Sequence, residues 1–175
     1  PVYGQIDLAS GKTFRLDSPP APGETFLNLP AAPLQVAAAG LASRLTPPTP
    51  ADIAPGLAAA YSYWLDLGAS AALVNGISVD IDTLAPGLAG ITQGKQISLS
   101  ADGAGWGWYV DPTPLDNGEF SATNAANEFV ATPGSAADGK LDLLTVLIHE
   151  MGHVLGLGHS PDGTDEMAAT VTPGV

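Results

Sequence analysis

The sequence predicts an α+β domain in which a small, twisted, mixed and mainly parallel sheet packs against two long helices. One helix is expected at about residues 51–67 and the other at about 141–155, because apolar residues recur in both segments at helical spacing. These residues are Leu57, Ala60, Tyr61, Trp64 and Leu65 in the first segment and Leu144, Ile148, Met151 and Leu155 in the second. Residues 77–81 alternate apolar and polar side chains, as a half-buried strand does.

Two further strands are expected, one near residues 97–99 and one from 106 to 110. Residues 111–139 are rich in Pro, Asp, Asn, Gly and Ala and are predicted to be loops. The pentapeptide Ala-Pro-Gly-Leu-Ala occurs at 54–58 and again at 85–89. We interpret this repeat as a coincidence in a chain rich in these four residue types.

The chain divides by composition into a flank, residues 1–50, and a domain, residues 51–175. The flank is rich in proline and ends in the run Thr-Pro-Pro-Thr-Pro at 46–50, which predicts an extended linker. The flank is interpreted as a linker, a pro-segment or part of a preceding module. Its first residues lack the pattern of a signal peptide, and the chain is expected to be a piece of something longer.

The charge and cysteine content exclude several classes of function. The formal net charge is −13, from 18 acidic and 5 basic residues, so nucleic acid and anionic membrane surfaces are not expected partners. Cysteine is absent, which excludes disulfides and thiolate metal sites. The acidity favours either solubility or the binding of hard cations such as calcium. Separately, the chain is expected to be a monomer that does not insert into a membrane.

The most informative stretch is His149-Glu150-Met151-Gly152-His153 and the six residues that follow it. Two histidines four residues apart on a helix lie on one face, so both can bind one metal ion. Glycines at 156 and 158 let the chain turn back and present His159 as a third ligand. Three protein ligands leave a coordination position open, which is the catalytic arrangement for zinc.

This pattern predicts zinc-dependent hydrolysis of internal peptide bonds. A zinc ion lowers the pKa of its water towards about 7, and Glu150 is expected to act as the general base. The alternative from the same residues is a non-catalytic zinc site, or buried histidines satisfied by hydrogen bonds.

The motif resembles that of the metzincin zinc peptidases. The serine that follows the third histidine, Ser160, makes it similar to the motif of the matrixin branch. The resemblance implies a zincin-like fold, in which the helix at 141–155 is the active-site helix and that at 51–67 a backing helix. It also implies that Met167 is the Met-turn residue, which packs beneath the metal. It covers roughly residues 50–170 and extends to matrixin-like modules of large bacterial surface or secreted proteins, so an extracellular or cell-surface location is expected.

The segment 111–120 resembles the part of matrixins that binds calcium. The resemblance implies that Asp116 and Glu119 are calcium ligands, so calcium is an expected structural cofactor beside one catalytic zinc. Pro114 stands where the family pattern has a histidine for a second, structural zinc, so that zinc is expected to be absent.

The segment around Gly105, Trp106 and Gly107 is a candidate for binding the substrate, since a glycine-rich sheet edge lets an extended peptide approach. The alternative is that Trp106 and Trp108 are core aromatics. Asp142 is interpreted as an exposed acid in the first turn of its helix, the alternative being that it caps or orients a group near the site.

The expected function is therefore that of a metalloendopeptidase acting on proteins or peptides, which also processes its own chain if the flank is its substrate. The alternative is a metal-binding or adhesive module of low activity within a large surface protein.

Overall fold

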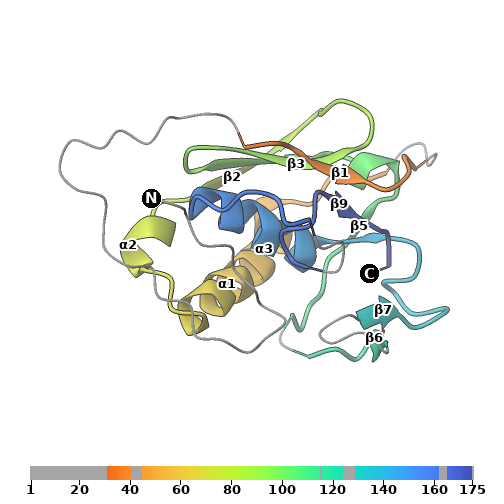
Figure 1. Cartoon of the computed structure of the whole chain (residues 1–175). Coiled ribbons are helices and arrows are strands. Elements are labelled where there is room, and N and C mark those ends of the chain that lie inside the picture. Colours follow the sequence, from red (N-terminus) through yellow and green to blue (C-terminus); the bar gives the residue numbers. More distant parts are fainter. Residues whose placement is uncertain (1–30, 41–44, 115, 124–128, 162–164, 175) are drawn as a thin grey trace.

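The fold is α+β, as predicted. The computed structural model describes residues 31–40, 45–114, 116–123, 129–161 and 165–174. A five-stranded mixed sheet lies over the two long helices, α1 (Pro50–Asp66) and α3 (Leu143–Val154), which pack against each other on one face of the sheet (Figure 1). The one-turn helix α2 is Ala71–Val74. The strands are β1 Leu34–Val36, β2 Ser78–Asp82, β3 Leu88–Gln93, β4 Gln96–Ser100, β5 Trp108–Tyr109, β6 Phe120–Ala122, β7 Phe129–Ala131, β8 Leu141–Asp142 and β9 Thr170–Val171.

The main sheet has the order β2-β4-β3-β1-β9. The pairs β2–β4 and β1–β9 are parallel, whereas β3–β4 and β1–β3 are antiparallel. The sheet is therefore mixed, and the prediction that it is mainly parallel was wrong. The cause is local: only Gly94 and Lys95 separate β3 from β4, and a two-residue connection can join only antiparallel neighbours.

Strand β1 comes from the segment that was expected to be a flank. Leu34–Val36 pairs with β3 on one side and with β9 on the other, so these residues belong to the sheet of the domain. Residues 1–30 lie outside the described residues, and their interpretation as a linker or pro-segment stays a prediction.

Strands β2 and β4 lie where alternation predicted them, but the strand expected at 106–110 is shorter. Gly103, Gly105 and Gly107 all have positive φ angles, of 58°, 84° and 79°, so the chain turns through a 3-10 segment at Gly103–Gly105 before β5. A small hairpin of β6 and β7 lies in the region that was predicted to be loop.

The two long helices meet through Trp64, which is 2% exposed. Its indole Nε1–H donates to the carbonyl oxygen of Ile148 on α3 at 3.0 Å. The most buried face of α3 is formed by Leu143, Val146, Leu147 and Met151. Of the predicted stripe only Met151 is fully buried, while Leu144 and Ile148 are partly exposed at the edge of a pocket described below.

Helix α3 begins at a buried N-cap. Asp142 Oδ2 accepts from the Thr145 backbone N–H and lies 2.8 Å from the Thr145 hydroxyl, and Asp142 is 7% exposed. The interpretation of Asp142 as an exposed first-turn acid was therefore wrong, since the residue precedes the helix and is buried. None of the described helices is long and apolar enough to cross a membrane.

Replacing Asp142 by alanine is expected to lower the free energy of unfolding by about 1 kcal/mol, because the first turn of α3 loses its capping acceptor. Urea unfolding followed by circular dichroism measures this. Asp142→Asn is the matched control, since the amide oxygen keeps the cap. An alanine variant as stable as the asparagine variant would show that the cap contributes nothing.

Candidate metal centre

The three histidines of the chain converge at one point. His149 and His153 extend from successive turns of α3, and the chain reverses after Gly156, whose φ is 89°, to bring His159 back. The Nε2 atoms of His149 and His153 are 3.0 Å apart, and each lies 3.3 Å from Nε2 of His159. Among the described residues, these three histidines are the set of potential metal ligands whose ligand atoms all lie close enough together to bind one ion.

The other ring nitrogens of the helix pair are held by backbone carbonyls. His149 Nδ1 lies 2.8 Å from the carbonyl oxygen of Glu166, and His153 Nδ1 lies 2.8 Å from that of Leu157. A carbonyl oxygen only accepts, so both Nδ1 atoms carry the proton. The Nε2 lone pairs are then left free and point at one another, as the second shell of a metal site requires.

A tetrahedral zinc ion fits this arrangement. With zinc–nitrogen distances of 2.0–2.1 Å, two ligand nitrogens are separated by about 3.3 Å, which agrees with the separations found. Without a cation, three lone pairs at this distance would repel one another. Burial also lowers the pKa of His149 to about 3 and lowers the pKa values of His153 and His159, so the imidazoles stay in the neutral form that binds metal.

Glu150 follows His149 on α3, faces strand β3 and is fully buried. Its Oε2 accepts from the Thr92 hydroxyl on β3 at 2.7 Å, whereas Oε1 has no hydrogen-bond partner among the described residues. Gly90 makes room for the carboxylate, because a Cβ there would lie 2.6 Å from Oε1. Burial raises the pKa of Glu150 to about 7, and the bond from Thr92 opposes this rise.

Met167 packs beneath the triad and is 3% exposed. A Cβ at Gly152, in the middle of the motif, would lie 2.3 Å from the sulfur of Met167 and 3.0 Å from Cζ2 of Trp64. The missing side chain at residue 152 therefore lets the methionine and the backing helix approach α3 directly below the histidines.

A family model for matrixins matches residues 93–174, a little under half of the chain, and the match includes the triad, Glu150 and Met167. Neither the curated proteins nor the solved structures include a match to the chain. The matrixin match and the triad together support a zinc metallopeptidase in general terms.

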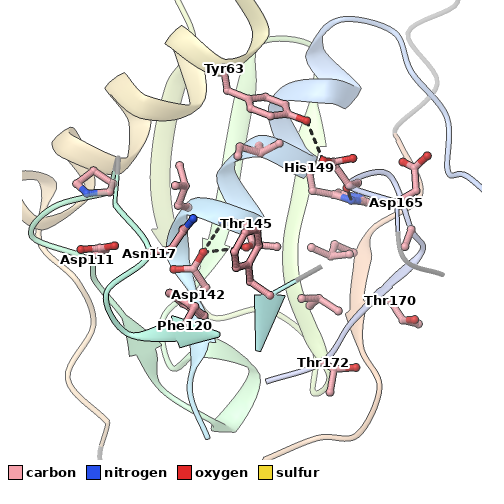
Figure 2. Close-up of a pocket in the computed structure, with 18 of the residues that line it drawn as sticks. Tyr63, Asp111, Asn117, Phe120, Asp142, Thr145, His149, Asp165, Thr170 and Thr172 are labelled. Atoms are coloured by element: carbon pink, nitrogen blue, oxygen red, sulfur yellow. Dashed lines mark hydrogen bonds between the residues drawn. The ribbon is translucent and has the colours of Figure 1, made fainter. Parts of the chain in front are cut away.

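A pocket of about 300 Å³ lies beside the triad, and Leu34 of β1 and Tyr63 of α1 line it together with residues of α3. Figure 2 shows Tyr63, Thr145 and His149 around it, and Leu144, Ile148 and Val171 add apolar surface. The Tyr63 hydroxyl donates to Glu166 Oε1 at 2.9 Å, and Glu166 also orients His149 through its carbonyl. Burial beside this carboxylate raises the pKa of Tyr63 well above its usual range.

The candidate substrate residues Gly105, Trp106 and Gly107 do not form a strand edge. They belong to the turn before β5 and contact the N-terminal segment: Trp106 Nε1–H donates to the carbonyl oxygen of Ala38 at 2.7 Å. Trp108 is a core residue, 9% exposed, as the alternative interpretation held. Whether these residues bind substrate stays a prediction.

The candidate calcium ligands are not part of the histidine cluster. Asp116 is exposed, and its Oδ1 accepts from the Gly118 backbone N–H at 3.1 Å. Glu119 Oε2 is buried and has no hydrogen-bond partner among the described residues. The described residues show no group of three ligands that includes either carboxylate, so calcium binding stays a prediction.

Sequence reasoning missed the residues that support the site from a distance: Leu34, Gly90, Thr92, Tyr63 and Glu166. Thr92 and Gly90 alternate on β3, but this strand carries mixed small and polar residues and gives no clear period-two signal. Glu166 adjoins Met167, and it contacts His149 through its backbone carbonyl, which no side-chain pattern reveals.

Proposed function

We propose that the chain is a zinc-dependent endopeptidase that hydrolyses internal peptide bonds of proteins or peptides outside the cell or at its surface. The observation that supports this most directly is the convergence of three neutral imidazoles at zinc-ligand separations. Three protein nitrogens leave zinc with an open position, as in catalytic rather than structural sites.

His149, His153 and His159 would hold the ion, and the carbonyl oxygens of Glu166 and Leu157 fix the two helical rings in the tautomer that binds it. Zinc there would supply Lewis-acid polarisation of a substrate carbonyl and would acidify water. Glu150 takes the proton from the attacking water and delivers it to the leaving amine.

The environment of Glu150 suits this role. The Thr92 hydroxyl fixes Oε2, so the carboxylate keeps one orientation, and Oε1 stays without a partner among the described residues. A buried polar atom without a partner is unusual in a native protein and often marks a functional group. We infer that Oε1 is the atom that receives and releases the proton.

The test is the hydrolysis of casein by the zinc-loaded chain and by its Glu150→Gln variant. The variant is expected to be slower by about 10²–10⁴-fold, because it loses the general base while keeping a side chain of the same shape. Elemental analysis is expected to find equal zinc in both proteins. Thr145→Ser, which keeps a hydroxyl at the rim of the pocket, serves as a control for general disturbance.

Two outcomes would contradict the proposal. If the wild-type chain binds zinc with the expected stoichiometry and hydrolyses neither casein nor gelatin, the chain is a metal-binding module. If Glu150→Gln hydrolyses casein as fast as the wild type, another group is the base.

A further inference from the structure

Strand β1 lies in the sheet as an inserted peptide, bonded along both edges. The Val36 N–H donates to the carbonyl oxygen of Gly87 at 2.9 Å on the β3 side. On the β9 side, the Gln35 and Ala37 N–H groups donate to the carbonyl oxygens of Ala169 and Val171 at 3.3 and 3.0 Å. Figure 1 shows β1, in orange, between β3 and the dark blue β9. Addition of an extended strand to sheet edges is a common way of holding peptides.

The side chain of Leu34 reaches the pocket beside the triad. It is 1% exposed and lines the pocket together with Ile148 and His149 of α3. The neighbouring Gln35 is exposed, so successive side chains of β1 alternate: Leu34 points towards α3 and Gln35 points away from it. The protein therefore places one of its own apolar side chains, that of Leu34, in the pocket next to the histidines.

The backbone of β1 passes the carboxylate of Glu150. Leu34 pairs with Gly90, the glycine whose missing side chain makes room for Oε1. The Leu34 nitrogen therefore belongs to the part of β1 that lies opposite Gly90, beside this carboxylate. The peptide bond that contains this nitrogen is Pro33–Leu34.

The segment after β1 is also held in place. The Gly40 N–H donates to the carbonyl oxygen of Ala104 at 3.0 Å, and a Cβ on Gly40 would lie only 2.1 Å from the carbonyl oxygen of Gly105. With the bond from Trp106 to Ala38, these contacts fix residues 38–40 on the turn before β5. The chain is thus anchored on the C-terminal side of the Pro33–Leu34 bond.

We propose that β1 occupies the site as the chain's own substrate and that the bond cut is Pro33–Leu34. This inference rests on the proposed function. Water adds to the carbonyl carbon of Pro33, the bond from that carbon to the Leu34 nitrogen breaks, and Glu150 carries the proton from the water to that nitrogen. The products are a new carboxylate at Pro33 and a new amino terminus at Leu34.

The same geometry regulates access. Any other protein substrate has to displace Leu34–Val36 from between β3 and β9 before it can pair with either strand. After the cut, residues 34–40 still hold their hydrogen bonds, so the new amino-terminal segment continues to compete with other substrates.

The test is intact-mass and amino-terminal sequence analysis of the full chain, produced without zinc and then incubated with it. We expect a fragment that begins at Leu34, formed at the same fractional rate after about tenfold dilution because the reaction is intramolecular. Glu150→Gln is expected to stay intact. Leu34→Asp is expected to slow the cut strongly, whereas Ser62→Ala, at an exposed position on α1, leaves it unchanged.

A chain that hydrolyses casein but is not cut at Pro33–Leu34 would overturn this inference while leaving the proposed function in place. A chain that hydrolyses neither would overturn the proposed function as well. A cut whose fractional rate falls in proportion to dilution would show that β1 of one molecule is not the substrate of its own site.

Peptide binding gives a second measurement that needs no catalysis. A fluorescent peptide with the sequence of residues 31–40 is titrated into full-length Glu150→Gln and into the same protein that also carries Leu34→Asp. The double variant is expected to bind at least about tenfold more tightly, because it no longer has an attached competitor at millimolar effective concentration. Equal affinity in two proteins with unchanged circular dichroism would show that β1 does not cover the peptide site.

Discussion

Replacing His153 by alanine is expected to remove bound zinc and to reduce peptide hydrolysis to the background of the uncatalysed reaction. The wild-type chain should hold about one ion, because the triad provides three nitrogens at zinc-ligand separations. His153 supplies one of these three nitrogens, and its Nε2 lies within 3.3 Å of both other Nε2 atoms. Elemental analysis after gel filtration measures the stoichiometry.

The same variant separates metal binding from folding. Zinc bound only by the folded state at about 100 times its dissociation constant stabilises a protein by about 2.7 kcal/mol, so wild-type unfolding should shift upwards with added zinc. His153→Ala should show no such shift, and Gln93→Ala, an exposed position on β3, should behave as the wild type. Zinc retained by His153→Ala at the wild-type stoichiometry and affinity would show that the ion binds elsewhere.

Replacing Trp64 by alanine is expected to lower the free energy of unfolding by about 3–5 kcal/mol, the range for removing a large buried aromatic side chain. The loss is large because the indole fills the space between α1 and α3 and donates to the Ile148 carbonyl. Its ring also packs against Gly152, directly below the histidines. Denaturant unfolding measures the change, and zinc affinity should weaken along with stability.

Two comparisons make this prediction specific. Trp64→Phe keeps most of the apolar volume and should cost less than the alanine variant, the remainder reflecting the lost hydrogen bond. Leu65→Ala, at an adjacent position that is 36% exposed, should cost far less. A Trp64→Ala protein that unfolds with the same free energy as Leu65→Ala would show that the contact between the two helices does not depend on the indole.

The clustering of the three histidines could be predicted because its geometry is local. Helical spacing places His149 and His153 one turn apart, and glycine at 156 allows the reversal that returns His159. The helices were predictable for the same reason, since α1 and α3 each carry a periodic apolar pattern. The assignment of fold class followed from these elements together with the alternation in β2.

The remainder of the site depends on partners far apart in the sequence. Strand β1 is three residues long and owes its structure to β3 and β9, which lie more than 50 and 130 residues away. The repeated pentapeptide makes the same point: residues 54–58 are helical in α1, whereas 85–89 lead through a turn into β3. Identical local sequence takes different structures because tertiary neighbours decide between them.

The position of Gly152 has a consequence for reading other sequences. Patterns for this kind of motif leave two positions between the histidines unspecified, yet here the second cannot carry even a methyl group without moving the sulfur of Met167 and the edge of Trp64. A search for chains with the same packing beneath the histidines should therefore require a glycine at that position together with a methionine after the third histidine. A redesign that places a larger residue at 152 has to move or shorten the Met167 side chain at the same time.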